Sequence, residues 1–373
     1  MGQVQEKEIM IYQILIDRFN GGWSEPPKND NRYLGGTLKG ITDKMDYIQS
    51  LGATAVWLSP FFQNDAYHGY HTTDYEQIDP HFGTWEDLSE LIAAAHQRGM
   101  RVIADFVPNH CHYKHPFFQD AINHPTTSPY RDWFYFKDSQ SAECLHFCGY
   151  YELQKFNLDN PATRDYFLKV GERLTDVGID GFRIDHALGI PLEFLRAFRR
   201  RMHELNPRTI VFGEVWAYGI QRRYFNTLRF RSLWRKCQCW LFGFRQETMQ
   251  MDYYDALDGV LDFEFQRLLL QELKAGHRLA NNEHLAKRLK RHFARYPSDS
   301  FQVIPFIDNH DTDRFLFNCK GDKTLVAEAM KLLELSGKEY AVYYGTECGM
   351  QNHRTIFNAE PYADLAVREA MRW

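Results

Sequence analysis

Three carboxylic acids in this sequence could act on one substrate. Each follows a short apolar run: Asp185 after residues 179–184, Glu214 after 209–212, and Asp311 after 301–307. Runs of this kind, separated by helical patterns, predict buried parallel strands. In an eight-stranded α/β barrel the C-terminal ends of all strands meet on one face, so we expect the three acids to share a cavity. A carboxylate nucleophile and a protonated carboxyl group beside one bond are what retaining glycoside hydrolysis requires.

Asp185 is the predicted nucleophile and Glu214 the predicted acid/base. Arg183 stands two residues before Asp185, so it points to the same side of the strand, where its guanidinium favours the charged carboxylate. Glu214 needs a raised pKa to hold a proton near pH 7, and partial desolvation by Trp216 together with the neighbouring carboxylates would supply it. We expect the two carboxyl groups on consecutive strands, roughly 5–5.5 Å apart.

Four motifs that include these acids resemble a known family. They are residues 105–110 (DFVPNH), 181–185 (GFRID), 213–216 (GEVW) and 306–311 (FIDNHD). In this order they resemble the four sequence regions of the α-amylase family of glycoside hydrolases, glycoside hydrolase family 13. The motif style is similar to that of neopullulanases and cyclomaltodextrinases, and the resemblance covers nearly the whole chain.

The resemblance implies a set of sugar contacts. Asp311 would be the third carboxylate, which the family uses to hold sugar hydroxyls and to favour an oxocarbenium-like transition state. His110 and His310 would donate to hydroxyls of the same ring, and Tyr70, with His68 beside it, would be the stacking platform for the sugar being cleaved. The predicted substrate-binding residues are therefore His68, Tyr70, His110, Arg183, Trp216 and His310.

The pattern of runs predicts an α/β fold, a (β/α)₈ TIM barrel built from residues 1–110 and 161–373. Residues 111–160 show no sustained period and are far longer than a normal βα loop, so they look like the small domain B that the family inserts after strand three. Family members usually continue with an eighth helix and a β-sandwich domain C. Here we expect domain C to be absent and the eighth helix to be missing or atypical, with residues 359–373 folded back as a short helix over strands one and eight.

No metal or other cofactor is predicted. Relatives that bind calcium have Asp where Lys155 stands, opposite the possible ligand Asn109, so calcium is not favoured. The inserted segment and its neighbourhood also carry several potential metal ligands: His110, Cys111, His112, His115, Cys144, His146 and Cys148. Their spacing matches no established zinc pattern, so free thiols and surface imidazoles are the favoured interpretation.

Composition excludes some partners. A net charge of −5 and a pI near 6.3 argue against nucleic acid. The N-terminal segment MGQVQEKEIM has no apolar core, and no stretch approaches 18 apolar residues, so we expect neither a signal peptide nor a membrane span. Seven cysteines are more consistent with reduced thiols than with a disulfide framework. We therefore expect a cytoplasmic protein whose partner is an α-glucan oligosaccharide, in an oligomeric state left open.

The leading hypothesis is a retaining hydrolase that cleaves α-1,4-glucosidic bonds in maltooligosaccharides, cyclodextrins or starch fragments by double displacement. A transglycosylase or glucosyl isomerase of the same family would differ in whether water or a sugar resolves the intermediate, and residues 186–189 match neither of the acceptor-side patterns that would decide this. A non-catalytic carbohydrate-binding barrel is a third alternative. Its signature would be loss of the acids, and all three are present.

Overall fold

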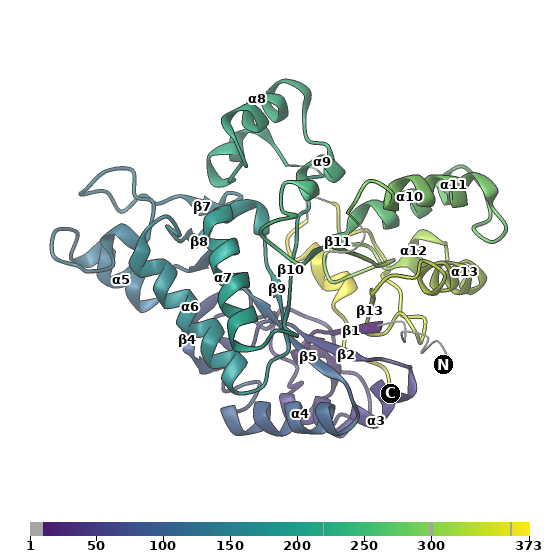
Figure 1. Cartoon of the computed structure of the whole chain (residues 1–373). Coiled ribbons are helices and arrows are strands. Elements are labelled where there is room, and N and C mark those ends of the chain that lie inside the picture. The colour runs from purple at the N-terminus through teal and green to yellow at the C-terminus, as the bar shows by residue number, and fades with distance from the viewer. Residues whose placement is uncertain (1–9, 219, 298–300, 359) are drawn as a thin grey trace.

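Eight short parallel strands pair around a closed circuit in the computed structural model, which describes residues 10–218, 220–297, 301–358 and 360–373 (Figure 1). Their order is β12-β11-β10-β9-β5-β2-β1-β13. The strands are β1 (Met10–Ile14), β2 (Ala55–Leu58), β5 (Arg101–Phe106), β9 (Gly181–Ile184), β10 (Ile210–Gly213), β11 (Gly259–Asp262), β12 (Gln302–Pro305) and β13 (Tyr340–Tyr343). A parallel bridge between Phe306 and Ala341 joins the two ends of the sheet, which gives the predicted barrel. The apolar run of residues 9–16 predicts the first strand, and its first residue, Ile9, lies outside the described residues.

Side chains from successive strand residues divide into two apolar clusters, as the period of a strand requires. Ile11 and Trp57 belong to a cluster inside the barrel, whereas Tyr12 and Val56, one residue away on the same strands, belong to the cluster beneath the helices. A barrel filled in this way is a packed core and no channel, so chemistry is confined to its rim.

Helices follow the strands and cover the outside of the barrel (Figure 1). The longer ones are α4 (Trp85–Gln97), α6 (Pro161–Asp176), α7 (Leu192–Leu205), α10 (Phe263–Lys274), α11 (Glu283–Phe293) and α13 (Lys323–Glu334); the short ones are α1 (Ile16–Phe19), α2 (Leu38–Asp43), α3 (Met45–Ser50) and α12 (Phe315–Asn318). The residue types predict Thr84 and Asn160 as helix N-caps and Pro161 as a first helical residue, and the structure has all three in these places. The Thr84 cap also forms a capping box with Asp87, which was not predicted. Helical spacing over residues 41–51 predicts one helix there, whereas the structure has α2 and α3, separated at Lys44.

The segment between β5 and α6 forms a separate lobe on an antiparallel sheet of order β6-β8-β7. Its elements are β6 (His110–His112), α5 (Pro116–Asn123), η1 (Arg131–Trp133), β7 (His146–Phe147) and β8 (Tyr150–Lys155). The lobe occupies the place predicted for domain B, and β6 begins one residue before the predicted boundary at 111. A hairpin of β3 (Phe62–Asn64) and β4 (Thr72–Ile78) lies beside it, with β4 in contact with β6.

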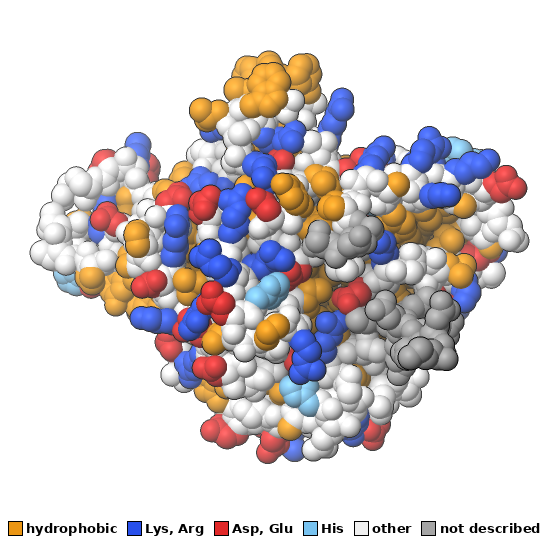
Figure 2. All heavy atoms as spheres, viewed as in Figure 1, with side chains coloured by type: hydrophobic (Ala, Val, Ile, Leu, Met, Phe, Trp, Pro, Cys, Tyr) orange, Lys and Arg blue, Asp and Glu red, His pale blue; other side chains and the backbone are white. Residues whose placement is uncertain are grey.

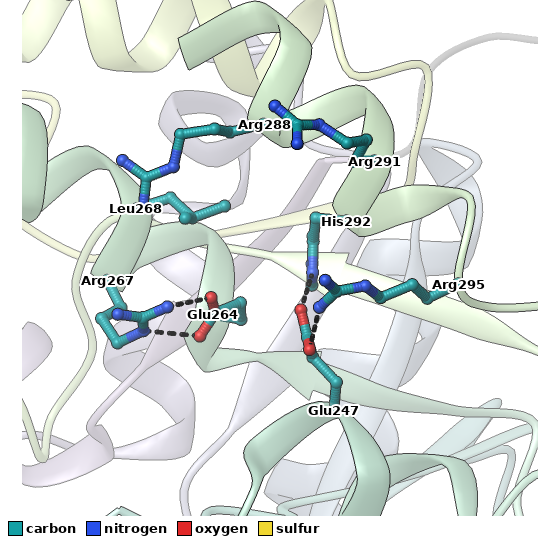
Figure 3. A pocket seen from close by; sticks show the side chains of 8 residues that line it. All are labelled: Glu247, Glu264, Arg267, Leu268, Arg288, Arg291, His292 and Arg295. Atoms are coloured by element: carbon teal, nitrogen blue, oxygen red, sulfur yellow. Dashed lines mark hydrogen bonds and ion pairs between the residues drawn. The ribbon is translucent and has the colours of Figure 1, made fainter. Parts of the chain in front are cut away.

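Charged side chains join α11 to α9 (Gln246–Met251), as Figure 3 shows. Glu247 accepts from His292 Nδ1 at 3.3 Å and pairs with Arg295. The other ring nitrogen of His292 lies 2.8 Å from Asp262 Oδ2, so the imidazole joins two acids while almost completely buried. Glu264 pairs with Arg267 on the opposite wall of the same hollow, which encloses about 260 Å³. These pairs have a structural role.

Helix α8 (Leu233–Phe242) projects from the barrel between η3 (Arg222–Thr227) and α9 (Figure 1). It exposes a group of large apolar side chains, which forms the orange cluster at the top of Figure 2: Leu233, Trp234, Trp240, Leu241 and Phe242. Its opposite side is anchored by Arg235, whose Nε lies 2.7 Å from Asp252 Oδ2. No helix among the described residues is long and apolar enough to cross a membrane.

The C-terminal segment packs against the first part of the chain, and the C-terminus lies beside α3 in Figure 1. The short helix expected there is a five-residue 3₁₀ helix, η4 (Ala363–Val367). Beyond it the Met371 N–H donates to Arg18 O at 2.7 Å, and the Trp373 ring lies 5.0 Å from that of Phe19. Without an eighth helix, apolar residues on strands one and eight such as Ile14 and Val342 would be expected to need cover, and both are buried.

Candidate active site

The register of β9 and β10 brings two of the predicted acids together. Ile184 pairs with Gly213, so Asp185 and Glu214 each follow a paired residue at the same edge of the sheet. The Glu214 N–H donates to Ile184 O at 2.9 Å, which fixes its backbone beside the other strand. The two acids therefore lie on consecutive barrel strands, as predicted.

A cleft of about 700 Å³ opens at this edge, within the range of ligand sites. Its walls include most of the predicted site residues: His68, Tyr70, His110, Asp185, Glu214, Trp216 and Asp311. Arg183 and His310 lie directly beneath them and are almost completely buried. The lobe contributes Phe147 and Tyr150, so the cleft lies between barrel and lobe.

Arg183 is the centre of the buried charges. Its Nη1 lies 2.8 Å from Asp185 Oδ1 and 2.9 Å from Asp105 Oδ1, and its Nη2 lies 3.1 Å from Glu214 Oε2. One guanidinium therefore serves three carboxyl groups. Sequence reasoning quoted Asp105 only as part of a motif and missed it as a member of the site. Its register with Arg183 across β5 and β9 puts it there.

Because Asp185 and Glu214 share the Arg183 guanidinium, their expected protonation changes. Burial raises the pKa of Glu214, as predicted, with Arg183 opposing and Asp311 reinforcing the rise. Burial also raises the pKa of Asp185, because Arg183 offsets only part of it while Glu214 and Asp105 add to it. This differs from the expectation that Arg183 keeps Asp185 ionised by itself. Two repelling carboxyl groups beside one guanidinium favour a state in which the pair holds one proton.

The surroundings of Asp311 lower its pKa, whereas those of Asp185 and Glu214 raise theirs. Although burial opposes ionisation, His310 and Arg368 hold the pKa of the Asp311 carboxyl far below its usual range. Its Oδ2 lies 3.0 Å from His310 Nε2, and its Oδ1 accepts from Arg368 Nη2 at 2.8 Å. Arg368 also pairs with Asp364, one helical turn earlier, at 2.6 Å. Sequence reasoning missed Arg368; the Asp-x-x-x-Arg spacing was the only signal.

Tyr70 is held rigidly over the buried charges. Its hydroxyl donates to Asp105 Oδ2 at 2.8 Å and lies 2.8 Å from His310 Nε2. The rings of Tyr70 and His310 are parallel within 2°, with centroids 5.4 Å apart. Gln13 Nε2 lies 2.7 Å from His310 Nδ1, which holds the other side of the ring. A fixed aromatic face at the cleft is the arrangement a sugar ring needs for stacking.

The remaining predicted contacts offer neutral polar or apolar surfaces to the cleft. His110 Nε2 is buried without a hydrogen-bond partner among the described residues, and burial lowers the pKa of His110 to about 3. His68 Nδ1 accepts from the Tyr70 N–H at 3.1 Å. Trp216 is half-buried and stacks on Phe263 at 4.8 Å. Unpartnered nitrogens such as His110 Nε2 are suited to bind sugar hydroxyls.

Lys155 lies where calcium-binding relatives are expected to have an acid. Its Nζ donates to Asn109 Oδ1 at 2.6 Å and to Gly189 O at 2.5 Å. Burial lowers the pKa of Lys155 to about 7. Two oxygens that could ligate calcium thus bind an amine instead, and the prediction of no calcium rests on these contacts.

Comparison with known proteins places this site in a family. Residues 13–373 match the family described as the α-amylase catalytic domain. The chain belongs to the α-amylase family. It is 33% identical to α-amylase 2 of Dictyoglomus thermophilum over 370 residues, which is 98% of this chain and 59% of that protein. It is 30% identical to a Bacillus sp cyclomaltodextrinase over 98% of this chain and 62% of the relative.

Solved structures of α-amylase family proteins have the same fold. The ligand-free cyclic α-maltosyl-(1→6)-maltose hydrolase of Arthrobacter globiformis superposes with a TM-score of 0.76 at 28% identity, covering 98% of this chain and 78% of that one. The α-amylase of Geobacillus thermoleovorans, complexed with acarbose, also gives 0.76 at 28% identity over 98% of this chain and 74% of its own. The chain spans about three fifths of the length of the curated relatives named above.

Proposed function

We propose that this α-amylase family chain hydrolyses α-1,4-glucosidic bonds in maltooligosaccharides, cyclodextrins or starch-derived α-glucans, with retention of configuration. One observation carries the proposal: Asp185 and Glu214 project from neighbouring strands onto the two terminal nitrogens of Arg183. Proteins named α-amylase and cyclomaltodextrinase among the relatives support the substrate class.

In the first step an oxygen of Asp185 attacks the anomeric carbon while Glu214 gives its proton to the glycosidic oxygen. The bond between that carbon and oxygen breaks, and a β-glycosyl ester of Asp185 remains. In the second step Glu214 takes a proton from water, the water oxygen attacks the same carbon, and the ester bond breaks. The separation of 5–5.5 Å between the two carboxyl groups remains a prediction of this mechanism.

The shared proton is assigned to Glu214. Asp185 has the shorter contact with Arg183, 2.8 Å against 3.1 Å, so its charged form gains more from the guanidinium. Asp311, kept ionised by His310 and Arg368, would accept from sugar hydroxyls and stabilise the positive charge that develops at the anomeric carbon.

The experiment compares wild type with Glu214→Gln on two substrates. On maltoheptaose we expect the variant to lose about 10³-fold or more in kcat/KM, because no acid protonates the leaving sugar. On α-maltosyl fluoride, whose leaving group needs no proton, formation of the glycosyl-enzyme should survive. Glu172→Gln, a surface carboxylate paired with Arg201, is the matched control. Equal loss on both substrates would contradict the role of Glu214.

Product sizes from maltoheptaose distinguish hydrolysis from transfer. Reducing sugars shorter than the substrate support hydrolysis, whereas products longer than maltoheptaose would show that a sugar resolves the intermediate. Formation of neither product by the wild-type chain would contradict the proposed function.

We also infer a cytoplasmic location. All seven cysteines are free, which suits a reducing compartment, and a relative 27% identical over 98% of this chain is the intracellular maltogenic amylase of Bacillus subtilis.

A further inference from the structure

Three side chains beside the cleft converge without hydrogen-bond partners. His71 directly precedes β4, His112 lies on β6 and Glu152 lies on β8, and their potential ligand atoms all fall within 4.8 Å of one another. None of the three side chains forms a hydrogen bond within the described part of the chain, although His112 is only 2% exposed and its Nδ1 is fully enclosed. Buried polar atoms are nearly always satisfied, so an unpartnered one calls for an explanation such as an ion.

The two imidazole rings lie close enough together to reach one ion. Their planes differ by 9° and their centroids lie 5.4 Å apart. An imidazole centroid lies roughly 3.2 Å from a metal bonded to its nitrogen at about 2.1 Å, so two rings at a tetrahedral angle have centroids about 5.2 Å apart. The observed spacing is close to this value.

Both imidazoles are available as ligands at neutral pH. Burial, reinforced by His112, lowers the pKa of His71 to about 4, and burial lowers the pKa of His112 as well. Neutral imidazoles have a free lone pair, whereas protonated ones repel a cation.

We propose that His71, His112 and Glu152 bind one divalent transition-metal ion, of which zinc is the best match. Two imidazoles and a carboxylate are a zinc ligand set, whereas calcium prefers oxygen alone. A fourth position would remain for water. Asp65 Oδ2 lies 3.7 Å from His112 Nε2, the other nitrogen of that ring, and Lys114 holds the Asp65 carboxylate at 2.9 Å.

The ion would join two parts of the chain that form the cleft. His71 adjoins Tyr70, and the tight β6–β8 pairing carries His112 and Glu152. Bound metal would therefore fix the loop that presents Tyr70 to the lobe, and would raise the melting temperature because it binds the folded state. The sequence could not show this site, because His71 lies far from the histidines of the inserted segment.

The test titrates chelator-treated, dialysed protein with zinc chloride by calorimetry, in a C237S/C348S background that removes the exposed thiols. We expect one ion per chain, and at least tenfold weaker binding in His71→Ala and in Glu152→Gln. His124→Ala, which removes an exposed histidine paired with Asp120, should bind as the background does. Cobalt(II) should give visible d–d absorption in the background protein and lose it in both ligand variants.

Glu152 is exposed, so Glu152→Gln should fold normally, and circular dichroism verifies this for each variant. Zinc binding of equal affinity in all variants would place the ion elsewhere and overturn the proposal. Absence of saturable binding in the background protein would overturn it as well. Neither result depends on the proposed glycosidase activity.

Discussion

Arg368 Nη2 lies 2.8 Å from Asp311 Oδ1, although 57 positions separate the two residues in the chain. The same guanidinium donates through Nε to His310 O at 3.0 Å and pairs with Asp364. The segment that follows the last barrel strand thus completes the electrostatics of the cleft. It does so by stabilising the charged form of the third acid.

Replacing Arg368 should move the acid limb of the pH–activity profile. In Arg368→Ala the pKa of Asp311 rises, so activity that needs the ionised carboxylate is lost at a higher pH as the solution is acidified. Removal of a hydrogen bond to a charged group costs about 1.5–3 kcal/mol, or roughly 10–100-fold in kcat/KM. Steady-state kinetics on maltoheptaose across pH measures both effects. Arg372→Ala, which removes an exposed arginine, is the control, and an unshifted profile in Arg368→Ala would contradict the role.

The contacts of Lys155 predict that calcium has no effect on the wild-type protein. Wild-type melting temperature and activity should not change with chelator or with added calcium. Lys155→Asp would place a carboxylate beside Asn109 Oδ1 and Gly189 O, which are oxygen ligands of the kind calcium prefers. We expect this variant to be destabilised without calcium and restored by it.

The control for calcium is Lys155→Met, which removes the amine without adding a carboxylate. It should lose about 1–3 kcal/mol for each acceptor left unpaired and should not respond to calcium. Loss of wild-type activity on chelation, with recovery on calcium, would show that the prediction of no calcium is wrong.

The C-terminal segment should be essential for stability. Met371 is 1% exposed, so Met371→Ala should lower the free energy of unfolding by about 2–5 kcal/mol. Deletion of residues 360–373 should lower the melting temperature sharply or give insoluble protein, because it uncovers Phe19 and removes Arg368. Urea denaturation measures the first effect, with Arg372→Ala as the exposed neighbour. A soluble, monomeric and equally stable deletion variant would refute the proposed role.

His292 should make stability fall at alkaline pH. Burial opposes its charge, but Asp262 and Glu247 outweigh burial and raise the pKa of His292 to about 9. Its contribution is therefore complete below about pH 6.5 and is lost as pH rises through about 9. The difference from the ordinary value corresponds to about 3 kcal/mol.

The loss in unfolding free energy caused by His292→Gln, measured with urea, should be larger at pH 6 than at pH 10. His124→Gln, at an exposed histidine, should show no such difference. The same loss for His292→Gln at both pH values would mean that His292 carries no charge in the folded protein.

The barrel and the main acids could be predicted because their signals are local. Strand-length apolar runs ending in Asp185 and Glu214 fix both the strands and the edge at which they end, and the cap at Thr84 fixes where α4 begins. No such local signal marks the break between α2 and α3 at Lys44 or the 3₁₀ form of η4.

The features that the sequence could not predict are contacts between residues that are far apart in the chain. Arg368 reaches Asp311 only because the final segment crosses the barrel edge, and Asp105 shares Arg183 only through strand register. The protonation of Asp185 also depends on how many carboxyl groups surround one guanidinium, which no spacing in the sequence reveals.

The pairing of β1 with β13 has a consequence for how the protein is made. Met10 is opposite Tyr340, so the first described strand has no partner on that side until synthesis of the chain has reached Tyr340. During synthesis, the apolar residues of β1 and the unpaired edge of the sheet stay open to other molecules. Contacts between residues so distant in sequence form slowly, and incomplete sheets of this kind aggregate. Efficient production of this protein therefore depends on protection of the growing chain, by chaperones or slow expression, until β13 closes the ring.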